Sequence, residues 1–126
     1  MMGAPARRVL VVEDEALLRD VVAQEMRDHG YEVEEAETGE IAVAMLERCA
    51  AFDALFTDIR LPGSVDGWQV AKAFRARFPA APVFYATGYS STRDEVDRSM
   101  FFRKPFKLPQ LILCLKAQLG ETPADP

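Results

Sequence analysis

Acidic residues follow two apolar segments that lie far apart in this sequence. Glu13 and Asp14 come directly after the apolar segment 8–12, and Asp58 comes directly after the segment 54–57. Carboxylates that converge in a low-dielectric pocket repel one another, so a hard divalent cation is the natural way to keep them ionised. Mg²⁺ fits best, because it combines a few carboxylates with waters and phosphate oxygens. These acids therefore predict a magnesium site.

Two other apolar segments end in a hydroxyl group and an ammonium group. Thr87 follows the segment 82–86, and Lys104 follows the segment 100–103. A carboxylate can attack phosphorus and form an acyl phosphate, and a neighbouring hydroxyl and cation would then bind and neutralise the phosphoryl oxygens. We therefore predict that Asp58 is the nucleophile, that Thr87 supplies the hydroxyl and that Lys104 supplies the positive charge.

The apolar pattern predicts the strands that must position these residues. Continuous apolar runs are typical of parallel strands buried on both faces, and an alternating run suits a strand at the sheet edge. The predicted strands are 8–12, 31–36 at the edge, 54–57, 82–86 and 100–103. Because ligands bind at the carboxyl ends of the strands in such sheets, the acids, the threonine and the lysine are expected to share one rim.

Apolar residues at helical spacing predict the helices between these strands. The predicted helices are 16–29, 38–49, 68–78, 107–119 and a short helix within the polar segment 91–99. Thr38 is placed to cap the second helix. The buried face of that helix would consist of Ile41, Ala42, Met45, Leu46 and Cys49. Strands that alternate with helices specify an open parallel α/β sheet with helices on both faces.

Length and composition restrict the function classes. A chain of 126 residues corresponds to one domain, at roughly 100–200 residues per domain. The net charge of −5 and the pI near 4.9 argue against nucleic acid or an anionic membrane as the main partner. No apolar stretch approaches the roughly 18 residues of a membrane span or resembles a signal peptide, so we expect a cytoplasmic protein. Cys49 and Cys114 are expected to pack as small apolar side chains rather than to form a disulfide.

The motifs together resemble those of a known family. They are, in order, Val11-Val12-Glu13-Asp14-Glu15, Thr57-Asp58-Ile59-Arg60-Leu61-Pro62-Gly63 with Asp66-Gly67, Ala86-Thr87-Gly88 and Lys104-Pro105-Phe106. In this order, over residues 8–119, they resemble the receiver domain of two-component response regulators. The resemblance implies a stand-alone CheY-like domain over residues 8–120, with tails at 1–7 and 121–126. It also implies a flavodoxin-like five-stranded parallel sheet of order 2-1-3-4-5, with helices on both faces.

The resemblance further implies the chemistry of the site. Asp58 would be phosphorylated by a sensor histidine kinase or a histidine phosphotransfer protein. Mg²⁺ would be held by Asp14, Asp58 and the backbone carbonyl of Arg60, with Glu13 acting through water. Lys104 would pair with the phosphoryl group, and its peptide bond to the following proline is expected to be cis. The protein would then be a phosphoacceptor that assists its own phosphorylation and dephosphorylation, not a conventional enzyme.

Departures from the family pattern concern the switch. The residues implied in the switch are Thr87, Tyr89 and an aromatic residue before the lysine that is usually Tyr and here is Phe101. Phe101 has no hydroxyl, so a switch through it would act by packing. The stretch between Thr87 and Lys104 is several residues shorter than in the family, which predicts a shortened fourth helix. The segment 85–89 resembles the FAT GUY subfamily of single-domain receivers, several of which belong to general stress signalling.

The same residues disfavour three other functions. A Mg²⁺-dependent phosphatase with an aspartyl nucleophile needs a general acid two residues after it, and Arg60 cannot donate a proton at neutral pH. A non-phosphorylated interaction domain would not need the full set of site residues. A flavin-binding module would need a phosphate-binding loop after the first strand. The favoured reading is a domain, monomeric when unphosphorylated, whose phosphorylated surface binds a downstream protein or passes the phosphoryl group on.

Overall fold

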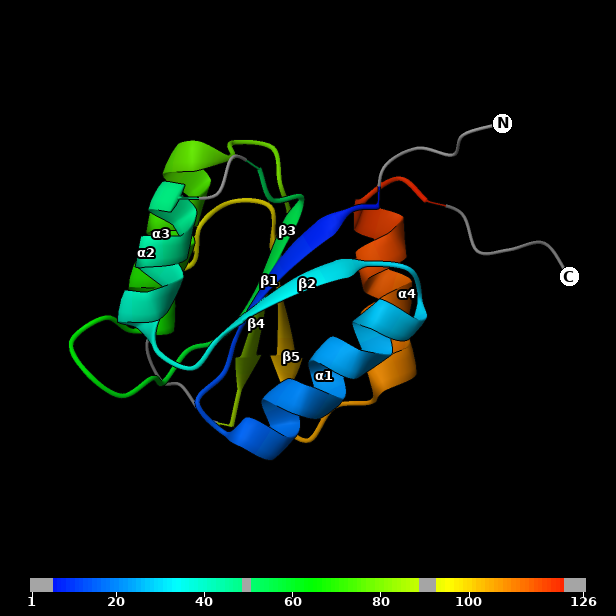
Figure 1. Cartoon of the computed structure of the whole chain (residues 1–126), viewed down its shortest axis with the longest axis horizontal. Coiled ribbons are helices and arrows are strands. Elements are labelled where there is room, and N and C mark those ends of the chain that lie inside the picture. The colour runs from blue at the N-terminus through cyan, green and yellow to red at the C-terminus, as the bar shows by residue number, and fades with distance from the viewer. Residues whose placement is uncertain (1–5, 49–50, 89–92, 122–126) are drawn as a thin grey trace, which may run out of the picture.

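In the computed structural model, which describes residues 6–48, 51–88 and 93–121, the chain forms a five-stranded parallel sheet (Figure 1). The strands are β1 (Arg8–Val12), β2 (Glu32–Ala36), β3 (Ala54–Asp58), β4 (Val83–Thr87) and β5 (Ser99–Arg103). Their order is β2-β1-β3-β4-β5, and every neighbouring pair is parallel. The predicted strands, the sheet order and the edge position of the second strand are confirmed.

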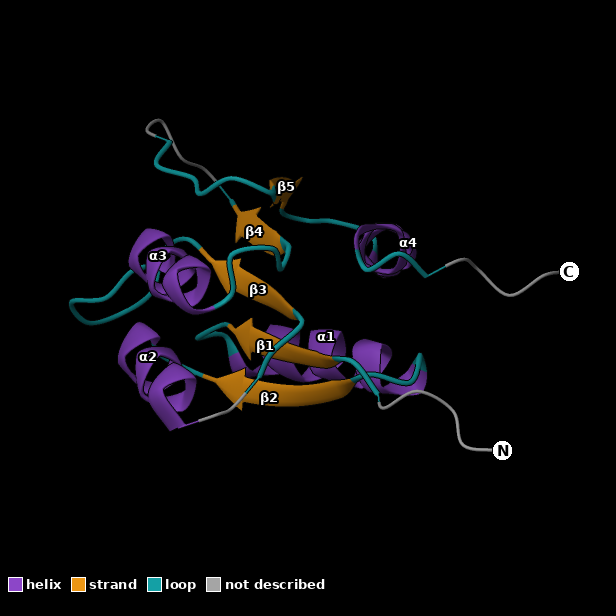
Figure 2. Cartoon of the chain, turned by 90° about the horizontal axis from the view of Figure 1, so that it is seen from above, coloured by secondary structure: helices purple, strands orange, loops and turns teal. Residues whose placement is uncertain are grey.

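Helices cover both faces of this sheet. They are α1 (Ala16–Asp28), α2 (Gly39–Arg48), α3 (Gly67–Arg77) and α4 (Leu108–Gln118). Figure 2 shows α2 and α3 on one side of the sheet and α1 and α4 on the other. Each side has its own core, formed for example by Val22 and Leu115 on the α1–α4 side and by Leu46 and Phe74 on the α2–α3 side. None of the described helices is long and apolar enough to cross a membrane.

Polar side chains cap the starts of two helices, one of them at the predicted Thr38, and a glycine follows the end of a third. The Thr38 hydroxyl accepts a hydrogen bond from the Ile41 backbone N–H (3.1 Å) and caps α2. Asp66 accepts from the Gln69 N–H (3.0 Å) at the start of α3, and the Gln69 side chain accepts from the Asp66 N–H in return. After α1, Gly30 has a φ of +92°, a conformation that side chains other than glycine rarely adopt. Of these signals, the Asp66 cap bears on the site, because it ends the loop that follows Asp58.

The expected helix between β4 and β5 does not form over residues 93–98, so four helices are seen in the described part of the chain. The polar side chains of this segment are used in contacts with α3 instead. Asp94 lies 2.5 Å from the Lys72 ammonium, and Asp97 lies 3.0 Å from Arg75 Nε. The Val96 N–H donates to the Tyr85 hydroxyl (3.2 Å). The Asp97 carbonyl accepts a hydrogen bond from Arg75 Nη2 (2.6 Å), so two backbone groups of this segment are satisfied by distant side chains instead of by a helix.

The predicted buried face of α2 is wrong at one position. Ala42 and Leu46 are buried, but the side chain of Ile41 is 37% exposed. Ile41 is adjacent to Ala42 in sequence, and one residue along a helix turns the side chain about 100° around the axis, away from the buried stripe. Cys49, which was assigned to the same face, lies outside the described residues.

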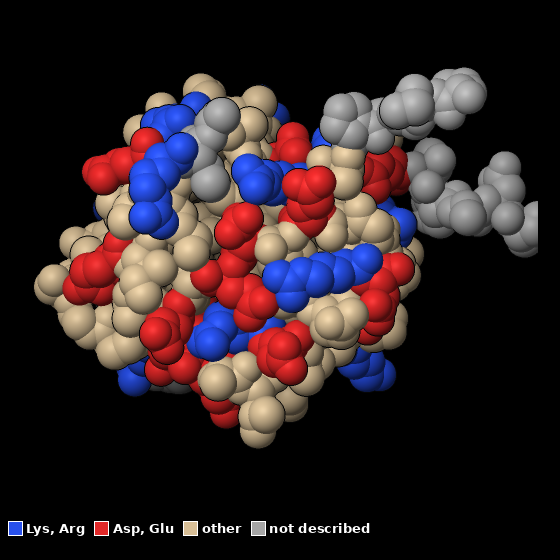
Figure 3. Space-filling view, viewed as in Figure 1, with Lys and Arg blue, Asp and Glu red and all other residues tan. Residues whose placement is uncertain are grey.

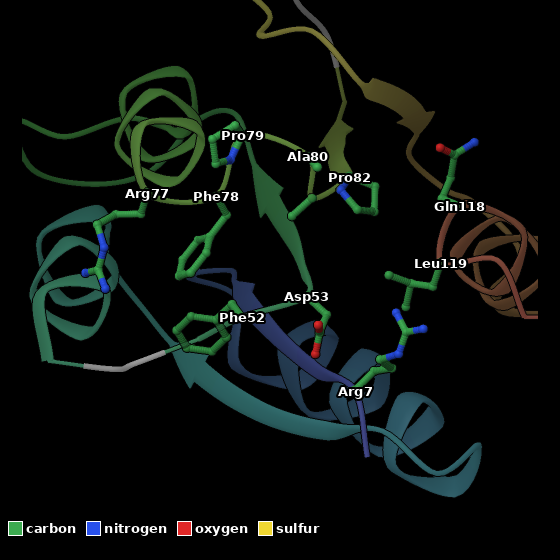
Figure 4. Close-up of a pocket in the computed structure, with 11 residues that line it drawn as sticks. Arg7, Phe52, Asp53, Arg77, Phe78, Pro79, Ala80, Pro82, Gln118 and Leu119 are labelled. Carbon is green, nitrogen blue, oxygen red and sulfur yellow. The ribbon is translucent and has the colours of Figure 1, made fainter. Parts of the chain in front are cut away.

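A cavity of about 420 Å³ lies at the amino ends of the strands. Figure 4 shows the rings of Phe52 and Phe78 near each other on one side of it and the Asp53 carboxylate between them and Arg7. Pro79 and Pro82, in the loop that leads into β4, also line it. This cavity is at the opposite end of the sheet from the predicted acids, which follow the carboxyl ends of the strands.

Candidate functional site

The carboxyl ends of four strands bring the predicted site residues together. Glu13 and Asp14 follow β1, Asp58 ends β3, Thr87 ends β4 and Lys104 follows β5. The strand register places Asp58 beside Ala86 and Thr87 beside Arg103, so that the acidic and basic positions share one rim. A cavity of about 330 Å³ opens there, and it is lined by Asp58, Arg60, Thr87, Gly88 and Lys104.

The three acids form a cluster suited to a hard cation. One carboxylate oxygen from each of Glu13, Asp14 and Asp58 lies within 4.8 Å of the others. Glu13 is 1% exposed and Asp58 is 7% exposed, whereas Asp14 is open to solvent. Three oxygen donors, of which one is accessible from water, match the preference of Mg²⁺ for a few carboxylates together with retained waters. The donor set therefore fits the magnesium ion that the sequence predicts.

Lys104 bridges two of these acids. Its Nζ lies 3.0 Å from Glu13 Oε1 and 3.0 Å from Asp58 Oδ2. Partial burial by itself lowers the pKa of the ammonium, but the hydrogen bonds to Asp58 and Glu13 outweigh burial and leave the pKa above its ordinary value. Lys104 is therefore held as a cation between two of the acids.

Glu13 is the acid of this cluster whose pKa is raised. Burial raises its pKa, the negative charge of Asp58 raises it further, and the Glu15 N–H and Lys104 act in the opposite direction. Because the folded protein holds this proton more tightly than the unfolded chain, the corresponding stability is present at low pH and is lost as the pH rises through the folded-state pKa. A bound divalent cation would offset this loss, because it favours the ionised carboxylate.

The backbone of Asp58 is packed against the start of α3. The Thr57 hydroxyl donates to the Asp58 carbonyl (2.8 Å), and the Gly67 N–H donates to the Ile59 carbonyl (2.8 Å). A Cβ atom added to Gly67 would lie 2.0 Å from the Asp58 carbonyl oxygen and 2.7 Å from the Ile59 Cα. Only glycine permits this approach. Gly67 belongs to one of the sequence motifs, but the sequence alone predicted no role for it.

The remaining predicted residues are placed as follows. Arg60 is exposed and lines the cavity, and Thr87 is partly buried at its rim. The Lys104 N–H donates to the Thr87 carbonyl (2.8 Å), which ties the two strand ends together. The Lys104–Pro105 peptide bond is cis, as expected. Tyr89 lies outside the described residues.

Phe101 belongs to an aromatic cluster beside the rim. Its ring stacks on Tyr85 at 5.1 Å with an interplanar angle of 28°, and it lies 6.0 Å from the Trp68 ring. The Arg93 guanidinium lies 3.9 Å from the Phe101 centroid, within the range of a cation–π contact. Sequence reasoning missed Tyr85 and Arg93, because no local pattern indicates contacts between strands and loops. Phe101 has no hydroxyl, but the neighbouring Tyr85 has one, and this hydroxyl accepts a hydrogen bond from the Val96 N–H.

Comparison with known structures finds close matches over nearly the whole chain. A family profile described as the response regulator receiver domain matches residues 9–116. A receiver protein from Sinorhizobium medicae superposes with a TM-score of 0.86 at 34% identity, over 91% of this chain and 95% of that one. The receiver domain of the sensor histidine kinase PA1611 from Pseudomonas aeruginosa gives a TM-score of 0.79 at 27% identity, over 93% of this chain and 100% of that one. That structure holds a magnesium ion in its active site cleft.

Curated relatives are longer than this chain. The response regulator protein FleR of Pseudomonas aeruginosa is 31% identical over 95% of this chain, which covers 26% of FleR. The transcriptional regulatory protein TrcR of Mycobacterium tuberculosis is 32% identical over 98% of this chain, which covers 51% of TrcR. The chain thus spans about a quarter to a half of the length of these relatives.

Proposed function

Because the chain belongs to the family of response regulator receiver domains, we propose that it is a signalling domain, over residues 8–120, that is controlled by phosphorylation of Asp58. The observation that supports this most strongly is the ion-paired cluster. Lys104 contacts both Glu13 and Asp58 at 3.0 Å, and the three carboxylates converge within 4.8 Å. This arrangement supplies a nucleophile, a cation for phosphoryl oxygens and ligands for a metal ion at one rim of the sheet.

The proposed reaction is a phosphoryl transfer. An Asp58 carboxylate oxygen forms a bond to phosphorus while the bond from phosphorus to the donor nitrogen or oxygen breaks, and the electron pair of that bond stays on the leaving atom. A phosphohistidine donor leaves as neutral imidazole when its other ring nitrogen carries a proton, and acetyl phosphate leaves as acetate. Asp58 becomes an acyl phosphate, and no oxidant or further reactant is consumed.

The residues around Asp58 have separate tasks in this transfer. Lys104 donates N–H bonds to the phosphoryl oxygens and offsets their charge. The Thr87 hydroxyl, at the end of the adjacent strand, binds another phosphoryl oxygen and moves toward it, which makes it the first element of the switch. Asp14, Asp58 and the Arg60 carbonyl would hold Mg²⁺, with Glu13 acting through water. When bound, the ion neutralises phosphoryl charge and helps to orient the donor.

Removal of the metal tests the proposed function directly. The full chain is mixed with acetyl phosphate and MgCl₂, and the intact mass is measured. We expect one added phosphoryl group with MgCl₂ and none when EDTA replaces it, because repulsion between the carboxylates and the incoming phosphoryl group is then uncompensated. Equal phosphorylation with and without EDTA would contradict the role of the acidic cluster, and no phosphorylation in either case would contradict the proposed function.

The proposed phosphodonor is a sensor histidine kinase or a histidine phosphotransfer protein, and an apolar groove beside the site suits its docking. The groove has a volume of about 420 Å³ and is lined by Glu15, Leu18, Val21, Lys104, Pro105, Phe106 and Leu108. It shares Lys104 with the phosphoryl site, so a partner seated there reaches Asp58. Leu17 is 80% exposed and Val21 is 48% exposed on the same helix. Because Leu17 and Val21 are four residues apart on α1, they are neighbours on its surface and extend the apolar groove, and a contiguous exposed apolar patch marks a protein interaction site.

Substitution in this groove is expected to separate two phosphodonors. Val21→Asp should slow transfer from a histidine-phosphorylated donor protein by about tenfold, because a charge replaces an apolar contact. Transfer from acetyl phosphate, which needs no docking surface, should be unchanged. Leu113→Asp is the matched control, since Leu113 is 55% exposed on α4 and lies outside the groove. An equal loss in both variants, or no loss with Val21→Asp, would remove the groove from the donor interface.

We propose that the output is a contact with a downstream protein. The resemblance of segment 85–89 to the FAT GUY subfamily supports a role in general stress signalling, and the net charge of −5 supports a protein that does not use nucleic acid as its main partner. The proposed location is the cytoplasm. Unphosphorylated, the domain is proposed to be a monomer. The stack of Phe101 on Tyr85 supports a switch that acts through packing.

A single hydroxyl tests that switch. Phe101→Tyr is expected to leave phosphorylation of Asp58 intact, because the Phe101 ring packs on the α2–α3 side of the sheet and lines no part of the phosphoryl cavity. It is expected to change the affinity of the phosphorylated protein for its downstream partner by several-fold, which a binding titration with purified partner measures. Equal affinity of the two phosphorylated proteins would exclude Phe101 from the switch.

A further inference from the structure

The backbone of Glu13 is held from two sides. Its N–H donates to the Ala36 carbonyl at the end of β2 (3.0 Å), and its carbonyl accepts a hydrogen bond from Arg19 Nη1 on α1 (2.9 Å). The side chain of Glu13 meanwhile accepts from the Glu15 N–H (3.0 Å). The segment that joins β1 to α1 and carries two of the acids is therefore fixed at its first residue by groups from a strand and a helix.

The Arg19 side chain is itself positioned. It is only 19% exposed, and its Nε lies 3.4 Å from Glu35 Oε1 on β2. Glu35 Oε2 also lies 3.0 Å from Nη1 of Arg27, which is about two turns further along α1. The Arg19 N–H donates to the Glu15 carbonyl (2.9 Å). Figure 3 shows acidic and basic side chains intermingled over β2 and α1, the elements that carry these ion pairs.

We propose that Arg19 is a positioning residue for the metal site, an inference that rests on the proposed function. Bringing three carboxylates within 4.8 Å of one another costs electrostatic energy, and a flexible segment would relax by moving Glu13 and Asp14 apart. The bond from Arg19 to the Glu13 carbonyl opposes this movement, because it fixes the backbone without using a carboxylate. The guanidinium also places a positive charge beside the backbone of Glu13.

The geometry requires arginine rather than a general cation. One nitrogen of the guanidinium contacts the Glu13 carbonyl while another faces Glu35, so a single rigid group joins the acidic segment to β2. A lysine ammonium is a single point at the end of a flexible chain and cannot span both positions in the same way. Arg19→Lys is therefore expected to keep the charge and lose part of the positioning.

Affinity for Mg²⁺, measured by isothermal titration of MgCl₂ into the full unphosphorylated chain, tests this role apart from phosphorylation. Groups that orient metal ligands typically contribute 10–100-fold to metal affinity, so Arg19→Gln should raise the Kd for Mg²⁺ by about tenfold and Arg19→Lys by less. Arg27→Gln is the matched control. Arg27 lies on the same helix, contacts the same Glu35 and donates to the Val33 carbonyl, but it does not touch Glu13. Its Kd should stay within about twofold of the wild type.

Each outcome decides the role of Arg19. An unchanged Kd in Arg19→Gln, or equal weakening in Arg19→Gln and Arg27→Gln, would overturn it, since the second result reflects general packing between α1 and β2. Thermal unfolding in EDTA identifies a variant that has lost its fold. If Arg19→Gln does not fold, Glu35→Gln replaces it, and a Kd that remains at the wild-type value would overturn the proposal. Failure of the wild type to bind Mg²⁺ or accept phosphate would instead refute the proposed function.

Discussion

Replacement of Asp58 by asparagine is expected to abolish phosphorylation by acetyl phosphate in the presence of Mg²⁺. The carboxamide has no anionic oxygen to attack phosphorus and cannot form the acyl phosphate. The variant also loses one of the three carboxylates of the cluster, so its affinity for Mg²⁺ should fall as well. Intact mass spectrometry measures the first effect and a titration with MgCl₂ measures the second. The loss of phosphorylation should be complete within the sensitivity of the mass measurement.

Asp53→Asn is the matched control for this substitution. Asp53 precedes the same strand, and its carboxylate accepts the Arg8 N–H (2.8 Å) at the opposite end of the sheet. This variant should be phosphorylated like the wild type. Phosphate uptake by Asp58→Asn equal to that of the wild type would falsify the assignment of the acceptor. Loss of phosphorylation in both variants would show that removal of a charge at either end of β3 is sufficient to abolish it.

Gly67→Ala is expected to destabilise the domain and to slow phosphorylation together. The added methyl carbon would lie 2.0 Å from the Asp58 carbonyl oxygen, a backbone atom that cannot rotate away. Either α3 or the end of β3 must therefore shift. Overpacking of this kind should lower the free energy of unfolding by about 3 kcal/mol, the upper part of the usual range. Denaturant unfolding measures the stability, and the rate of phosphate uptake measures the displacement of Asp58.

Gly88→Ala separates the steric effect from the loss of a glycine. Gly88 lines the cavity of the site, but a Cβ atom there would meet nothing within 4 Å. Its free energy of unfolding should remain within about 0.5 kcal/mol of the wild type. If Gly67→Ala is equally stable and is phosphorylated at the normal rate, the close approach of α3 to Asp58 has no role in placing the acceptor.

Much of the fold could be predicted because its strands are continuous apolar runs. A strand that is buried on both faces appears in the sequence as an unbroken apolar run. Three of the four described helices also begin near a capping residue or a proline, namely α2 at Thr38, α3 at Asp66 and α4 at Pro109. The segment 93–98 shows where this reasoning ends. Its conformation depends on ion pairs with Lys72 and Arg75 and on the Tyr85 hydroxyl, all distant in sequence. No pattern within a polar segment indicates such partners.

The residues of the site likewise fall into those that the sequence could predict and those that it could not. Glu13, Asp14, Asp58, Thr87 and Lys104 could be predicted because each stands at a strand end and has a side chain with recognisable chemistry. Arg19, Gly67 and Tyr85 could not be assigned, because their contributions are a hydrogen bond to a carbonyl, the absence of a side chain and a ring contact across two strands. Residues that react or bind a ligand can be recognised from their amino-acid type and their place at a strand end. Residues that position them are identified only from interatomic distances in the folded structure.

The double ion pair of Lys104 has a consequence for how a phosphoryl group can be received. An ammonium group carries three N–H bonds, and the contacts with Glu13 and Asp58 use two of them. A third donor therefore remains for an incoming oxygen, so the first bond to the phosphoryl group can form before either resting bond breaks. In the proposed function, capture of the phosphoryl group would therefore begin as an addition to the resting hydrogen-bond network, and exchange of hydrogen-bond partners would follow.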